Sequence, residues 1–217
     1  MGIYGWLAKR SWNTREKLHL AHLRRRLHNH SFCLFTNNCV GGVICHNLNQ
    51  PFRSPTVNLW MTAEGFLTFM NDLPFFLNCE IEQVFEEGIQ YPIGRMRHGD
   101  SVVILYFMHY DSFQTAVEKW RVRASRVDLS NVYVILDYPG TNDTPETQNR
   151  VREKFDRLPF EKKAMLTNTS GVDGSNVFPF GFYDRDLMPG KILQRKNNRT
   201  VKRYIDDFDY VSFLNKK

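Results

Sequence analysis

The stretch that decides the fold runs from Ser101 to Leu136 and reads SVVILYFMHYDSFQTAVEKWRVRASRVDLSNVYVIL. Two apolar runs stand at its ends, SVVILYFM at 101–108 and NVYVIL at 131–136, and both are typical of strands buried on two faces. Between them Ser112 is a good helix N-cap. The apolar positions that then share one helical face are Phe113, Val117, Trp120 and Ala124. The stretch therefore predicts a strand, a helix and a second strand, with 101–108 as a central strand.

The same alternation continues on both sides of this stretch. Further strands are predicted at 31–36, 55–61 and 163–167, and further helices at 43–48, 62–76, from Thr144 onward and at 200–214. Strands that alternate with helices predict an α/β fold, a layered sandwich with a mostly parallel central sheet flanked by helices.

The positive charge is concentrated at the N-terminus. The chain has 217 residues and a net charge of +6, and residues 1–26 hold seven basic side chains and one acid, so the rest of the chain sums to zero. We predict a basic helical arm over 1–30 and a single α/β domain over 31–217. A helix rich in tryptophan and basic residues is typical of an anionic membrane surface. The alternative is a peripheral helix packed on the domain with a solvated basic face.

A second basic cluster lies near the C-terminus and is followed by acids. Its members are Lys191, Arg195, Lys196, Arg199, Lys202 and Arg203. Neither cluster has the interleaved stacking residues or a known motif of nucleic-acid binding, so nucleic acid is not an expected partner.

No apolar run approaches the roughly 18–20 residues of a membrane-spanning helix. Lys9, Arg10 and Arg15 interrupt the apolar segment that a secretory signal requires. We therefore expect a cytoplasmic protein, peripheral to the inner face of the membrane if the arm binds there. The cysteines form no CxxC pair and no zinc spacing, so we expect reduced thiols, no metal and no cofactor.

Polar residues follow the predicted strands where each strand leaves the core. They are Asn37, Asn38 and Cys39; His109, Tyr110 and Asp111; Asp137 and Tyr138; and Thr167 and Asn168. Ligands of an open parallel sheet bind beyond the carboxyl ends of its strands. A thiol, an imidazole and a carboxylate on neighbouring strands are the groups of a nucleophilic site.

Cys39 is the centre of this prediction, because it precedes two glycines at the start of a predicted helix. The positive end of a helix dipole lowers the pKa of a thiol, and glycines let backbone N–H groups face an oxyanion. We predict Cys39 as nucleophile, His109 as general base and Asp137 as the group that orients the imidazole. The predicted binding residues are Asn37, Asn38, Gly41, Gly42, Ser54 and Tyr110.

Plainer explanations exist for each of these residues. Free cysteine is among the most buried residue types, and a glycine turn between a strand and a helix is often only a turn. A different chemistry, sugar-nucleotide transfer, is suggested by the acidic spacing of Asp184-Arg185-Asp186.

Three blocks of sequence resemble a known bacterial family. The first is 36–42 (TNNCVGG) with 51–59 (PFRSPTVNL); the second is 91–94 (YPIG), 107–110 (FMHY) and 118–120 (EKW); the third is 155–159 (FDRLP). Over 31–168 the chain is similar to the family called domain of unknown function nineteen-nineteen, whose members are commonly labelled exopolysaccharide or capsule biosynthesis proteins. Members often carry an acidic pair after Pro-Ile-Gly, where this chain has RMRHGD at 95–100.

The resemblance implies a role in surface-polysaccharide assembly. With the cysteine prediction it gives an enzyme that modifies a glycan or a lipid-linked glycan precursor by acyl transfer or hydrolysis, through a thioacyl intermediate on Cys39. The alternatives are a non-catalytic partner of the polysaccharide machinery, bound to the membrane by its basic arm, and a glycosyltransferase. An enzyme of the first kind places Cys39 and His109 within hydrogen-bond reach beside a pocket.

Overall fold

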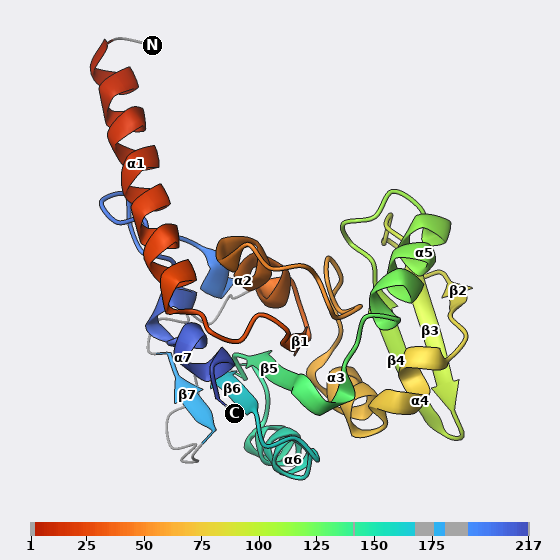
Figure 1. Ribbon diagram of the computed structural model, residues 1–217. Helices are drawn as coiled ribbons and strands as arrows, with labels where there is room; N and C mark the ends of the chain where they lie inside the picture. Colours follow the sequence, from red (N-terminus) through yellow and green to blue (C-terminus); the bar gives the residue numbers. More distant parts are fainter. Residues whose placement is uncertain (1–2, 141, 168–175, 181–190, 217) are drawn as a thin grey trace.

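The computed structural model describes residues 3–140, 142–167, 176–180 and 191–216, without the side chains of residues 3–10. Its main sheet has the strand order β1-β5-β6-β7, and every neighbouring pair is parallel (Figure 1). The strands are β1 (Cys33–Thr36), β5 (Val132–Tyr138), β6 (Lys163–Thr167) and β7 (Val177–Pro179). The predicted α/β class with a mostly parallel sheet is confirmed.

The sequence of β5 explains why the sheet is covered on both faces. All seven of its residues are buried, as are all residues of β1 and β6. Alternate side chains serve different cores: Val134 and Leu136 pack into one, Tyr133 and Ile135 into the other. Near-continuous apolar strands of this kind require helices on both sides.

Helices far apart in the chain cover these two faces. Apolar residues of α1 (Ile3–Arg26), α2 (Val40–Leu48) and α7 (Tyr210–Leu214) share the core of Tyr133 and Ile135. Those of α3 (Ala63–Asn71), α4 (Leu73–Asn78), α5 (Phe113–Ala124) and α6 (Pro145–Asp156) share the other. Three short 3-10 helices also occur, at Leu129–Asn131, Lys191–Leu193 and Tyr204–Asp207.

A second, antiparallel sheet is formed by β2 (Glu82–Val84), β3 (Ile93–His98) and β4 (Ser101–Tyr106). The prediction of 101–108 as a central parallel strand is therefore wrong. His98 pairs with Ser101 across a two-residue turn in which Gly99 has φ +56, a conformation that glycine adopts without strain. This tight hairpin makes β4 the partner of β3, and only Val103 and Leu105 of β4 are fully buried.

Three further predicted elements differ from the structure. Residues 55–61 form bends and irregular chain, and only Trp60 makes an isolated antiparallel bridge, to Tyr106. The helix predicted over 62–76 is two helices, α3 and α4, separated at Asp72. The last predicted helix is shorter than expected, because a 3-10 helix at Tyr204–Asp207 precedes α7.

The basic arm is a single long helix, α1, which extends away from the body of the molecule (Figure 1). Leu23 in its last turn, and Leu27 directly after it, are buried in the core that also contains apolar residues of α2 and α7. Within the described residues, no helix combines the length and hydropathy needed to cross a membrane.

Candidate functional site

The Asn37 side chain links the carboxyl ends of β1 and β5, two neighbouring strands of the parallel sheet that lie far apart in the sequence. Its Nδ2 donates to the carbonyl oxygen of Asp137 at 3.1 Å, and its Oδ1 accepts from the N–H of Asp137 at 2.9 Å. The last backbone pair of these strands is Thr36 with Ile135. Beyond the last paired residues, the Asn37 side chain thus makes the hydrogen bonds that the main chain of β1 would otherwise make. It satisfies the N–H and the carbonyl oxygen of Asp137, which would otherwise be buried without a partner.

Asn38 fixes the carboxylate of Asp137 itself. Its Nδ2 donates to Oδ2 of Asp137 at 2.7 Å, while its Oδ1 accepts from the N–H of Val40 at 3.0 Å. Asn38 and Asp137 are both 3% exposed. The amide therefore caps the start of α2 at one end and orients a buried carboxylate at the other.

A pocket of about 300 Å³ lies at this edge of the sheet, beyond β1 and β5 and beside the start of α3. It is the position at which open parallel sheets bind ligands. The residues that line it are Asn37, Trp60, Met61, Thr62, Ala63, Asp137, Tyr138, Pro139, Gly140, Asn142 and Asp143. Two carboxylates, two amides, two hydroxyls and an indole are thus brought together.

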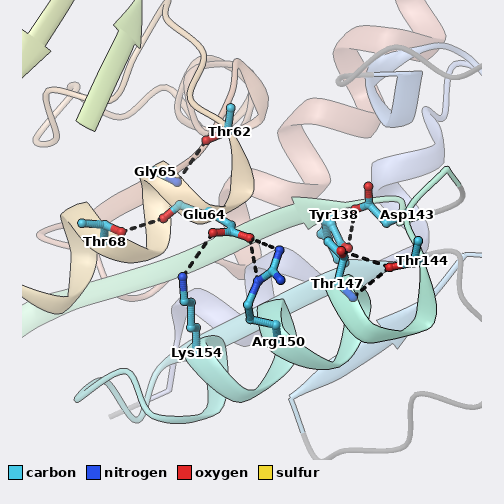
Figure 2. Close-up of polar contacts among 10 residues, drawn as sticks. All are labelled: Thr62, Glu64, Gly65, Thr68, Tyr138, Asp143, Thr144, Thr147, Arg150 and Lys154. Atoms are coloured by element: carbon cyan, nitrogen blue, oxygen red, sulfur yellow. Dashed lines mark hydrogen bonds and ion pairs between the residues drawn. The ribbon is translucent and has the colours of Figure 1, made fainter. Parts of the chain in front are cut away.

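An ion-pair network holds the two helices beside the pocket in place (Figure 2). Glu64 in the first turn of α3 accepts hydrogen bonds from Arg150 at 2.8 and 3.0 Å and from Lys154 at 3.2 Å, both on α6. The hydrogen bonds from Arg150 are the main reason that the pKa of Glu64 lies below its ordinary value. Thr62 caps α3 by accepting from the N–H of Gly65.

Tyr138 positions the second carboxylate of the pocket. Its hydroxyl donates to Oδ2 of Asp143 at 2.5 Å, a contact drawn in Figure 2. Burial, and then the hydrogen bond to Asp143, raise the pKa of Tyr138. Tyr138 therefore stays protonated and keeps donating to Asp143 over the physiological pH range.

Cys39 is half-buried and is the N-cap residue of α2, but its side chain makes no capping hydrogen bond. Burial raises the pKa of the Cys39 thiol, the opposite of the shift predicted from its place at a helix start. Burial is the main reason that the pKa of the neighbouring Tyr110 is raised, and a charge on Cys39 adds only a small further increase. The environment of Cys39 favours the thiol over the reactive thiolate.

His109 lies away from the edge of the parallel sheet. It is exposed, in a turn that follows β4, and β4 belongs to the antiparallel sheet. Among the described residues His109 makes no hydrogen bond or ion pair with Cys39 or Asp137. The structure therefore brings Asp137 together with Asn37 and Asn38, and does not join these residues to His109.

The two predicted glycines sit where α2 starts. The N–H of Gly41 donates to Oγ1 of Thr36 at 3.1 Å, and a Cβ on Gly41 would lie 2.8 Å from the same atom. Gly41 is thus required for close packing of α2 on β1, and its N–H is not available to an oxyanion. A Cβ on Gly42 would meet Val57 at 3.3 Å.

Ser54 and Tyr110 also hold the chain around this site. The Ser54 hydroxyl is 2.9 Å from Oγ1 of Thr56, which accepts from the N–H of Thr36 on the outer side of β1. The Tyr110 hydroxyl donates to the carbonyl oxygen of Val57 at 2.9 Å. Both residues fix the segment that covers the edge of the sheet.

Trp60, Thr62 and Asp143 are pocket residues that sequence reasoning did not select. Trp60 belongs to the predicted strand 55–61, and nothing in its spacing indicates that it lines a pocket. Asn168 and the Asp184-Arg185-Asp186 triplet lie outside the described residues. Within the described part of the chain, no group of His, Cys, Asp and Glu side chains is arranged to hold a metal ion.

Fold and site together define an α/β protein with a polar pocket at the carboxyl edge of a parallel sheet. The chain belongs to the family described as domain of unknown function (DUF1919), whose model matches residues 10–215. A Haemophilus influenzae protein described as uncharacterized is 32% identical over 193 residues, which cover 89% of this chain and 88% of the relative. The family predicted from the three sequence blocks is thereby confirmed, over more of the chain than 31–168.

Proposed function

We propose that the protein is an enzyme that binds a glycan or a glycan precursor in the pocket at the carboxyl edge of the parallel sheet and modifies it. The observation that carries the proposal is the buried Asp137 carboxylate, oriented by Asn38 in a pocket that also holds Trp60 and Asp143. The assignment to surface-polysaccharide assembly rests on the family resemblance.

The composition of the pocket suits a polyhydroxylated ligand. Sugar hydroxyls donate to carboxylates and accept from amides, and Asp137, Asp143 and the exposed Asn142 provide both kinds of group. The C–H faces of a sugar ring are apolar and pack on an aromatic surface, which the half-buried Trp60 provides. Trp60 is itself held by the ring of Tyr106, at a centroid distance of 4.5 Å.

Asp137 is the group that we assign to the chemistry. Asp137 lines the pocket, and a hydrogen bond from Asn38 holds its carboxylate in one orientation. A carboxylate in this setting can accept the proton of a sugar hydroxyl as that oxygen bonds to the carbonyl carbon of an acyl donor and the donor's leaving group departs. In a hydrolysis it accepts the proton of a water that attacks an acyl ester of the glycan, which breaks into the free sugar hydroxyl and the acid. This role does not require Cys39, whose raised pKa and lack of a bonded base weigh against the thioacyl route.

The test is ligand binding by saturation-transfer NMR, with a panel of monosaccharides and uridine-diphosphate sugars as probes. For any probe that binds, Asp137→Asn should weaken binding about tenfold or more, because a hydrogen bond to a charged group is lost. Asp100→Asn makes the same charge change at an exposed turn and should bind like the wild type. Equal binding by both variants, or no saturable binding of any probe, would favour the non-catalytic partner.

A further inference from the structure

Two basic segments that are far apart in the sequence lie side by side in the structure. The guanidinium of Arg195 pairs with Glu16 of α1 at 2.8 Å and stacks on the ring of Trp12 at 4.8 Å. Arg15 donates to the carbonyl oxygen of Arg199 at 2.9 Å. The C-terminal segment, blue in Figure 1, therefore runs along the middle of α1. The two clusters recognised in the sequence form a single surface.

One side of this surface is basic and open to solvent. Arg15, Leu18, His22 and Arg25 recur at helical spacing along α1 and are all exposed. Lys202 lines the same small pocket as His22, which places the C-terminal segment next to them. We call this set the basic face: Arg15, Leu18, His22, Arg25, Arg199 and Lys202.

The acids of the two segments do not neutralise the basic face. Glu16 pairs with Arg195, Asp207 with Lys196 and Asp209 with Arg26. Asp206 lies 3.5 Å from His19. Every acidic side chain of residues 11–26 and 191–209 thus lies next to a basic residue that is not part of the basic face. Among the described residues, the four cations of the basic face have no ion pair.

We propose that the basic face binds an anionic membrane surface. Exposed basic side chains are attracted to negatively charged phospholipid headgroups. Leu18 is 65% exposed in the middle of the face. Leu18 would be buried among the headgroups of a bilayer, whereas a phosphate backbone offers it no apolar contact. α1 itself extends away from the body of the protein (Figure 1). This inference is independent of the proposed glycan site.

The test is co-sedimentation of the full chain with phosphatidylcholine vesicles that contain or lack about 30% phosphatidylglycerol. The wild type should bind only the anionic vesicles, and about 0.5 M salt should weaken binding, because salt screens exposed charges. The decisive variant is Arg199→Glu/Lys202→Glu, since it leaves α1 unchanged. Its partition coefficient should fall at least about tenfold, since each basic residue near the surface contributes roughly fivefold.

Matched variants separate the surface from its alternatives. Arg97→Glu/Lys119→Glu makes the same charge change at exposed positions elsewhere and should bind vesicles like the wild type. Leu18→Ser should weaken vesicle binding, and thermal unfolding should show that each variant is folded. Binding by Arg199→Glu/Lys202→Glu that equals the Arg97→Glu/Lys119→Glu control would overturn the proposal. So would a wild type that binds a DNA duplex but not anionic vesicles.

Discussion

Asn38 and Asp137 are joined by a 2.7 Å hydrogen bond between side chains that are each 3% exposed. Asn38 lies two residues beyond the end of β1, and Asp137 is the penultimate residue of the neighbouring strand β5. The two residues are separated by 99 positions in the sequence. The other end of the Asn38 amide caps α2. One residue therefore connects the start of a helix, the edge of the sheet and the carboxylate that we assign to the chemistry.

Replacing Asn38 by Ala should destabilise the protein by about 2 to 4 kcal/mol, because a buried carboxylate loses a donor and α2 loses its cap. Urea unfolding followed by circular dichroism measures the change. Asn71→Ala removes an exposed amide on α3 and serves as the control. A loss of stability equal to that of the control would show that Asn38 is not needed to hold Asp137.

Gly41→Ala should destabilise the protein by about 1 to 3 kcal/mol, since the new methyl group would overlap Thr36 on the buried side of α2. Gly42→Ala is the matched change one residue later. The new methyl group of Gly42→Ala would lie 3.3 Å from Val57, and this close contact is offset by the higher helix propensity of alanine. The unfolding midpoint of this variant should therefore stay near that of the wild type. If Gly41→Ala were as stable as Gly42→Ala, the close packing of α2 on β1 would be refuted.

The Cys39 thiol should react slowly with iodoacetamide at neutral pH, because burial raises its pKa. The rate should rise only at alkaline pH, with the site of alkylation identified by mass spectrometry. Cys45 is buried more deeply, with a pKa raised to about 12, and should react more slowly still. Rapid alkylation of Cys39 below pH 7 would restore the thioacyl route as the leading chemistry.

The ion pairs of Glu64 should contribute to stability at neutral pH and not in acid. Since the folded protein has a lowered pKa for Glu64, its contribution is present above the unfolded pKa of about 4.3 and is lost as the pH falls through the folded value. Glu64→Gln should therefore melt below the wild type at pH 7, and the difference should shrink once the pH falls below the unfolded pKa and vanish below the folded one.

The effect should be small, because Glu64, Arg150 and Lys154 are partly exposed and screened by solvent. Glu153→Gln, whose partner Arg157 lies at 3.6 Å on the same helix, is the control. A Glu64→Gln melting difference that persisted unchanged into acid would exclude the ion pairs as its cause.

The sequence predicts the fold class and most of the parallel sheet, since β1, β5 and β6 are apolar runs next to clear helix signals. It does not predict the sheet to which 101–108 belongs. An apolar run indicates that a strand is buried, but it does not indicate which strand it pairs with. For 101–106 the turn at Gly99 decides the pairing, because it folds this strand back onto β3. The prediction of His109 as general base depends on 101–108 being a strand of the parallel sheet, and it is in the antiparallel sheet instead.

The same distinction applies to the pocket. The polar ends of β1 and β5 can be recognised because parallel strands of one sheet end at one edge. The position of Trp60 cannot be predicted in this way, because it depends on the path of an irregular segment, 55–61, that makes only one isolated bridge. The raised pKa of Cys39 likewise depends on its burial in the folded protein, which the neighbouring sequence does not reveal.

The measurement that tests the central claim most directly is the response of the side-chain amide signals of Asn37 and Asn38 to a bound probe, in nitrogen-15 NMR spectra. A sugar or uridine-diphosphate sugar that binds at the carboxyl edge should shift both signals saturably. The shifts should weaken in Asp137→Asn and persist in Asp100→Asn. Saturable binding that leaves both amides unshifted, and shifts residues elsewhere, would contradict the placement of the site.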